Sequence, residues 1–197
     1  MKNTKKKAYL TLINSLLNSS SSQVNSILNA NHINPLESSL VLANRQRITL
    51  ADITSCTMRD CFLVTLSACE SGLTDINKVT DDYVGLPSGF LISGVKTVVS
   101  SLWLVNDLST ALLMIRFYEN LINSQSTSPQ SVSIALNQAQ LWLRDATKIQ
   151  LEEWITEYQL NSNPTLRNQL RRRFHNMPDD EQPFHSPFYW AAFCAIG

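Results

Sequence analysis

The chain has 197 residues and no net charge, because 16 lysines and arginines balance 16 aspartates and glutamates. Proteins that bind nucleic acid in general normally carry an excess of basic residues, so this balance argues against that class. Apolar residues make up 44% of the chain, which is enough for a sizeable core and excludes wholesale disorder.

The N-terminal stretch differs in texture from the rest of the chain. Residues 1–31 are rich in lysine, serine and asparagine and show only a weak helical pattern, so we expect an unassigned, partly disordered leader there. No apolar run in the sequence approaches the ~20 residues that a membrane-spanning helix needs. We therefore expect a cytoplasmic protein that has neither a membrane nor a nucleic acid as its partner.

Apolar runs predict the strands of a sheet. Leu40–Ala43 is a short extended run after Pro35. Phe62–Ser67 and Thr97–Trp103 lack the alternation of a half-exposed strand, which is typical of strands buried on both faces. Phe188–Ile196 is a further run of this kind near the C-terminus.

Helical spacing of apolar residues lies between these runs, over residues 82–92, 107–122, 131–146 and 149–160. Pro87 is expected in the first turn of the first helix, and Gly94 just after its end. Asn106 or Asp107 is expected to cap the second helix. Strands that alternate with helices predict an α/β fold, with a mostly parallel sheet and helices on both of its faces.

One local segment carries residues suited to chemistry, because a predicted buried strand runs into Ser67-Ala68-Cys69 and Gly72 follows. Ligands in open α/β sheets bind at the carboxyl ends of central strands, so Cys69 is expected at an accessible crevice. A thiol is strongly nucleophilic once a base or a positive field removes its proton. Its backbone N–H, beside a glycine, can stabilise a developing oxyanion. The alternative is that Cys69 is a small buried hydrophobic residue.

The hexapeptide Ser67-Ala-Cys-Glu-Ser-Gly72 resembles the nucleophile motif of CHAT domains, the caspase- and separase-like peptidase domains that are often joined to TPR repeats. Further blocks resemble this family in the same order: Asn34–Ala43, Leu50–Ile53, Gly85–Val105 and His185–Gly197. We therefore expect a CHAT domain over residues 32–197, with a polar insertion near residues 161–184.

The resemblance implies a caspase-like fold and a Cys–His pair that hydrolyses a peptide or protein without a metal or another cofactor. The His takes the thiol proton and later protonates the leaving amine. The loop around the nucleophile would supply oxyanion and substrate contacts from Ser67, Ala68, Glu70, Gly72 and Asp82. Acidic residues there would select a basic substrate side chain, the alternative being ordinary solvated loop and helix-end charges.

The sequence departs from the family pattern at the catalytic base, which the family places in a His-Gly pair upstream of the Asn34 block. His32 is the histidine in that region, and Ile33 follows it instead of glycine. We name His32 as a candidate base, with a loop role as the alternative. We expect a domain that is N-terminally incomplete and inactive alone. It would be a pseudo-peptidase that binds or regulates, or a half-domain completed by a chain that supplies the missing N-terminal strands.

Overall fold

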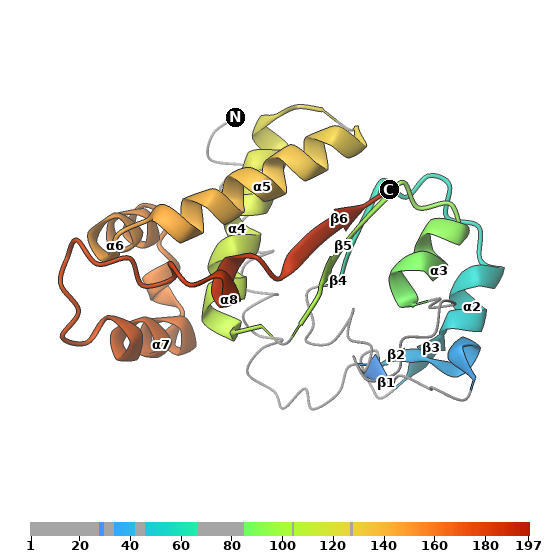
Figure 1. The fold of residues 1–197 in the computed structure, drawn as a ribbon, viewed down its shortest axis with the longest axis horizontal. Helices are drawn as coiled ribbons and strands as arrows, with labels where there is room; N and C mark the ends of the chain where they lie inside the picture. Colours follow the sequence, from blue (N-terminus) through green and yellow to red (C-terminus); the bar gives the residue numbers. More distant parts are fainter. Residues whose placement is uncertain (1–27, 30–33, 42–45, 67–84, 104, 127) are drawn as a thin grey trace. The chain divides into compact units, whose positions relative to one another are not determined.

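The computed structural model describes residues 28–29, 34–41, 46–66, 85–103, 105–126 and 128–197 (Figure 1). These residues divide into two compact units. We call the described residues of 25–105, 124–136 and 192–197 the sheet unit. We call residues 106–123 and 137–191 the helical unit. Helix α5 (Pro129–Asp145) contributes residues to both units.

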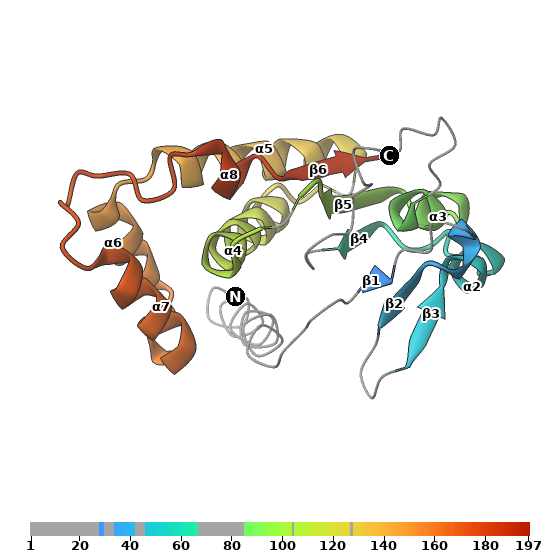
Figure 2. The same cartoon turned by 60° about the horizontal axis from the view of Figure 1, so that its bottom comes forward.

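The sheet unit contains a small antiparallel sheet in the order β1-β2-β3. Its strands are Leu28–Asn29, Ser39–Val41 and Arg47–Thr49, and the 3-10 turn η1 (Pro35–Glu37) precedes β2. Figure 2 shows β2 and β3 side by side, with β3 leading into α2. The short strand predicted after Pro35 is therefore present.

Helix α2 (Leu50–Ser55) begins immediately after β3, because its first turn is closed by a reciprocal capping box. Thr49 Oγ1 accepts a hydrogen bond from the Asp52 backbone N–H at 3.1 Å. The Asp52 carboxylate accepts from the Thr49 backbone N–H at 2.9 Å. The pair satisfies two backbone donors that would otherwise lack acceptors at the start of the helix.

A second sheet has the order β4-β5-β6, with strands Leu63–Leu66, Thr97–Ser101 and Phe193–Ile196 (Figure 1). Strand β4 pairs in parallel with β5, which confirms the α/β class. The sequence predicts a mostly parallel sheet, whereas the described pairings are of both kinds. Strand β6 enters at the carboxyl end of β5, where Phe193 lies opposite Ser101, and so runs antiparallel to it.

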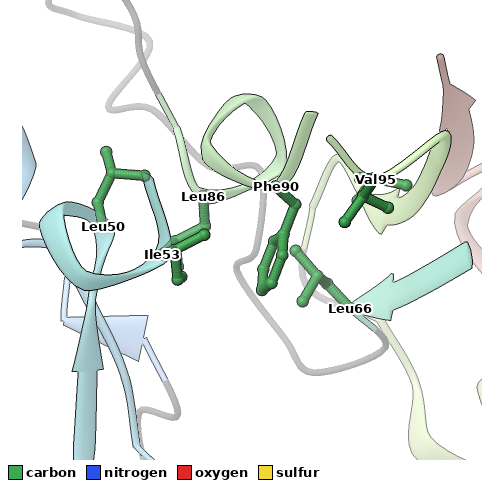
Figure 3. Packing of buried hydrophobic residues seen from close by; sticks show 7 residues of the cluster. Leu50, Ile53, Leu66, Leu86, Phe90 and Val95 are labelled. Atoms are coloured by element: carbon green, nitrogen blue, oxygen red, sulfur yellow. The ribbon is translucent and has the colours of Figure 1, made fainter. Parts of the chain in front are cut away.

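The core of the sheet unit joins α2, α3 (Leu86–Ile92), β4 and β5 (Figure 3). Seven buried apolar residues form it: Leu50, Ile53, Leu66, Leu86, Phe90, Val95 and Val98. Full burial of an aliphatic or aromatic side chain of this size stabilises a fold by about 1.5–3 kcal/mol. Gly89 lets α3 approach α2, because an added Cβ would lie 2.1 Å from Leu50 Cδ1.

The helical unit contains α4 (Asp107–Asn123), the end of α5, α6 (Lys148–Glu157), α7 (Pro164–Phe174) and α8 (Pro187–Trp190). Asn106 caps α4 as predicted, since its Oδ1 accepts from the Ser109 N–H at 3.1 Å. The 3-10 turn η3 (Leu160–Ser162) and α7 occupy much of the range predicted as a polar insertion. Buried Leu166, Leu170 and Phe174 anchor α7.

Two predicted elements have other boundaries in the structure. The sequence predicts one strand over Phe188–Ile196, but the first part of this run is α8 and only Phe193–Ile196 pairs with β5. Pro187 explains the difference, because it stands in the first turn of α8, where its missing N–H costs nothing. Helix α3 begins at Leu86, with Pro87 in its first turn, and Gly94 follows its end with φ +103°.

Candidate functional site

The strand that leads to the candidate nucleophile is β4, whose last residue, Leu66, lies opposite Ser100 of β5. The predicted nucleophile Cys69 and loop residues Ser67, Ala68, Glu70, Gly72 and Asp82 lie outside the described residues, as does the candidate base His32. The structure therefore describes the frame of the site, and the roles of those residues stay predictions.

Both ends of the segment 67–84 join one hydrophobic core. Leu66, which precedes the segment, is 8% exposed, and Leu86, which follows it, is 4% exposed. Figure 3 shows both side chains turned toward the same cluster, one from β4 and the other from α3. The core thus fixes the points at which the nucleophile segment leaves the sheet and returns to the fold.

The carboxyl end of β5 lies beside that of β4 and carries buried hydroxyl groups. Ser100 is 2% exposed and Ser101 is fully buried. Ser100 Oγ and Cys194 Sγ lie 3.9 Å apart, within hydrogen-bonding distance. Because β4 and β5 are parallel, this polar end of β5 lies at the sheet edge where open α/β sheets place their ligands.

The two described histidines belong to the helical unit. His175 is exposed at the end of α7, and exposed His185 uses its backbone carbonyl to accept a hydrogen bond from Trp190 Nε1 at 3.1 Å. This hydrogen bond joins His185 to the last residue of α8. This agrees with a structural role for His185 in the C-terminal segment.

Sequence reasoning missed a polar network that joins α4 to α6. Arg116 Nη1 donates to Glu119 Oε2 at 2.8 Å, and the Tyr158 hydroxyl donates to the other carboxylate oxygen of Glu119. Burial raises the pKa of Tyr158, and the hydrogen bond to Glu119 raises it further. The spacing of Arg116 and Glu119 indicates a helical pair, but nothing in the sequence connects Glu119 with Tyr158.

A comparison with known protein families identifies the family to which this chain belongs. The sequence profile of the CHAT domain matches residues 18–197. This chain belongs to the CHAT domain family. The match confirms the family that the motif around Cys69 predicts and includes every candidate site residue of this CHAT domain. No curated protein matches the chain.

The match places this CHAT domain among caspase-like, peptidase-related domains. The profile match begins at residue 18, whereas a domain boundary at residue 32 stays a prediction. Within the described ranges, none of the helices has the length and apolar character needed to cross a membrane.

Proposed function

We propose that this CHAT domain carries a peptidase-like site with Cys69 as the nucleophile, that the chain alone is catalytically silent, and that it serves as a binding or regulatory module. One observation supports it above all. The nucleophile motif follows directly after β4, a strand in parallel register with β5, yet the sequence contains no His-Gly pair. A cytoplasmic peptide or protein is the expected ligand of such a site.

The proposed chemistry assigns a role to each residue near the nucleophile. Cys69 would attack the substrate carbonyl, and the backbone N–H groups around Ala68 and Cys69 would stabilise the oxyanion. Ser67 and Gly72 would shape the loop so that a substrate backbone can approach. The carboxylates of Glu70 and Asp82 would favour a basic substrate side chain.

We expect no peptidase activity because the family's His-Gly proton acceptor is absent from the sequence. A neutral thiol is a poor nucleophile, and general acid–base catalysis typically contributes about 10²–10⁴-fold. His32 is the candidate base, but Ile33 stands where the family has a glycine. Bulk at that position would hinder the close backbone approach that an oxyanion donor needs. Peptide binding without turnover is therefore the expected activity of this chain.

The test compares the reactivity of individual cysteines in the purified chain. Iodoacetamide labelling of Cys69 is followed by mass spectrometry against pH, with the exposed Cys56 as an internal reference. We expect the labelling of Cys69 to have the midpoint of an unactivated thiol, about 8.5, and we expect no cleavage of a peptide library. Cleavage that Cys69→Ala abolishes, together with a Cys69 midpoint well below that of Cys56, would show an active peptidase.

The second candidate function is a half-domain to which a partner chain supplies a histidine base and further strands. The absence of a His-Gly pair from the 197 residues favours it. Its test begins with the coding sequence next to that of this chain, where we look for a buried strand that ends in His-Gly. Addition of that product should lower the Cys69 labelling midpoint and leave Cys56 unchanged. An unchanged Cys69 midpoint would reject completion by that product.

A further inference from the structure

A groove of about 600 Å³ opens within the helical unit, on α4, α5 and α6. Arg116 of α4, Trp142 and Asp145 of α5, and Glu153 and Trp154 of α6 contribute to its lining. All of its described lining residues belong to the helical unit.

Aromatic rings form one wall of this groove. The ring centroids of Trp142 and Trp154 are 4.8 Å apart, and those of Trp154 and Tyr158 are 5.1 Å apart. The Arg116 guanidinium carbon lies 5.2 Å from the centroid of Trp142. This contact shows that the wall accepts a cation on a ring face, where the negative face of the π-system attracts it.

The charges of the lining favour a further cation. Asp145, Glu153 and Glu157 bring three carboxylates to the groove, against the single guanidinium of Arg116 among the lining residues. Arg116 is already bound to Glu119, and Asp145 to Arg144 at 2.7 Å. Glu153 is exposed and enters none of the ion pairs formed by the described residues. The carboxylate of Glu153 therefore gives this part of α6 a negative charge that none of these ion pairs neutralises.

Two of the lining residues carry buried donors that lack acceptors among the described residues. Trp154 is 8% exposed, and its indole Nε1 has no hydrogen-bond partner among the described residues. The Nε atom of Arg116 is likewise buried without a partner there. Buried unpaired donors destabilise a protein, so a small shift of the rings that brought them to a bound oxygen would favour the complex.

We propose that this groove binds a basic segment of a partner protein. A lysine or arginine side chain would lie against Glu153 and Glu157, and a backbone carbonyl would accept a hydrogen bond from Trp154 Nε1. A peptide supplies both the cation that the carboxylates attract and the acceptor that the indole lacks. A small inorganic cation offers no acceptor, and the phosphates of nucleic acids or lipids are repelled by the carboxylates.

The test uses two fluorescein-labelled peptides, the basic GKLRLKG and its charge-reversed counterpart GELELEG, in anisotropy titrations of the full chain at low salt. We expect the basic peptide alone to bind. The double variant Glu153→Gln/Glu157→Gln should weaken its affinity about tenfold. The matched control Glu152→Gln changes an exposed glutamate of the same helix outside the groove and should have no effect. Absence of binding, equal binding of both peptides, or an equal effect of the control would overturn the proposal.

Replacement of Trp154 by its isostere 3-benzothienylalanine separates a binding role from a structural one, because sulfur takes the place of the N–H and the bicyclic ring keeps its size. We expect weaker peptide binding, by about threefold, with no loss in melting temperature. Unchanged affinity, or a fall in melting temperature that accompanies the weaker binding, would overturn the role given to Nε1. Cys69→Ala should bind the basic peptide as the parent does, so this result does not depend on the fate of the proposed peptidase site. A loss of binding in Cys69→Ala would place the peptide elsewhere.

Discussion

The hydroxyl group of Tyr158 on α6 donates a hydrogen bond to the carboxylate of Glu119 on α4, 39 residues earlier in the chain. The same carboxylate accepts from Arg116 at 2.8 Å, and its side chain is 12% exposed. Hydrogen bonds to a charged acceptor are stronger than those between neutral groups, and partial burial limits competition from water. Glu119 therefore ties α6 to α4 within the helical unit.

Removal of the Tyr158 hydroxyl should loosen this connection. We expect Tyr158→Phe to lower the free energy of unfolding by about 1–2 kcal/mol, because the ring stays in place and one charge-assisted hydrogen bond is lost. Urea denaturation followed by circular dichroism measures the change. Tyr189→Phe is the matched control, since the Tyr189 ring packs on Phe184 and Phe188 in the same unit. Equal effects of the two variants would mean that the Tyr158 hydroxyl has no special part.

Alkaline pH should act on the same contact. Burial, the hydrogen bond to Glu119 and the charge of Glu119 all raise the pKa of Tyr158. The folded-state pKa thus exceeds the unfolded value near 10, so this contribution to stability is complete below about pH 10 and is lost above it. Between about pH 9 and pH 11, Tyr158→Phe should lose less stability than the parent. Parallel stability curves would contradict the assignment.

Local signals in the sequence were enough for several elements. Asn106 caps α4, and Gly94 follows α3, because each position has a local chemical requirement that one residue type meets. The secondary structure of the run Phe188–Ile196 was harder to predict, because a short apolar stretch does not distinguish a strand from a buried helical turn. Pro187 was the available signal that its first part begins a helix.

The functional features of the chain were likewise predictable only in part. The motif around Cys69 predicts the family, because the hexapeptide and its neighbouring blocks keep their order along the chain. The groove on α4, α5 and α6 could not be foreseen. Trp142 and Trp154 meet only after α5 and α6 have packed, and no local pattern encodes that contact. Apolar spacing predicts the helices, but it gives no sign of the contact between the two tryptophans.

Acid pH should weaken the start of α2. Hydrogen bonds from the Thr49 side chain and backbone lower the pKa of Asp52. The folded-state pKa then lies below the unfolded value near 3.9, so this stabilisation is present above about pH 4 and is lost as pH falls further. Asp52→Asn should therefore be less stable than the parent at neutral pH and lose less stability on acidification.

Urea midpoints at a series of pH values, from neutral to acidic, measure this difference. Asp180→Asn is the control, because Asp180 is an exposed aspartate outside the capping box. If Asp52→Asn and Asp180→Asn show the same pH dependence as the parent, the capping box does not couple protonation to stability.

The close approach of α3 to α2 makes Gly89 a sensitive position. A Cβ there would lie 2.1 Å from Cδ1 of Leu50, which is fully buried in the core cluster, so the Leu50 side chain would have to shift within a packed core. Overpacking costs about 1–3 kcal/mol, whereas alanine gains up to about 1 kcal/mol over glycine within a helix. We expect Gly89→Ala to lower the free energy of unfolding by about 1–2 kcal/mol, and Ser88→Ala, on the same helix, to change it little.

A double-mutant cycle identifies the cause. Leu50→Ala alone should cost about 2–5 kcal/mol, because it leaves a cavity in the core cluster. In that background Gly89→Ala removes no space that Leu50 needs, and its methyl group can fill part of the cavity. The second substitution should then cost nothing or restore some stability, with a coupling free energy of at least about 1 kcal/mol. If the two effects add, Leu50 is not what excludes a side chain at position 89. Because Leu50 and Leu86 belong to the same cluster, strain at Gly89 should also disturb the point at which the nucleophile segment re-enters the fold.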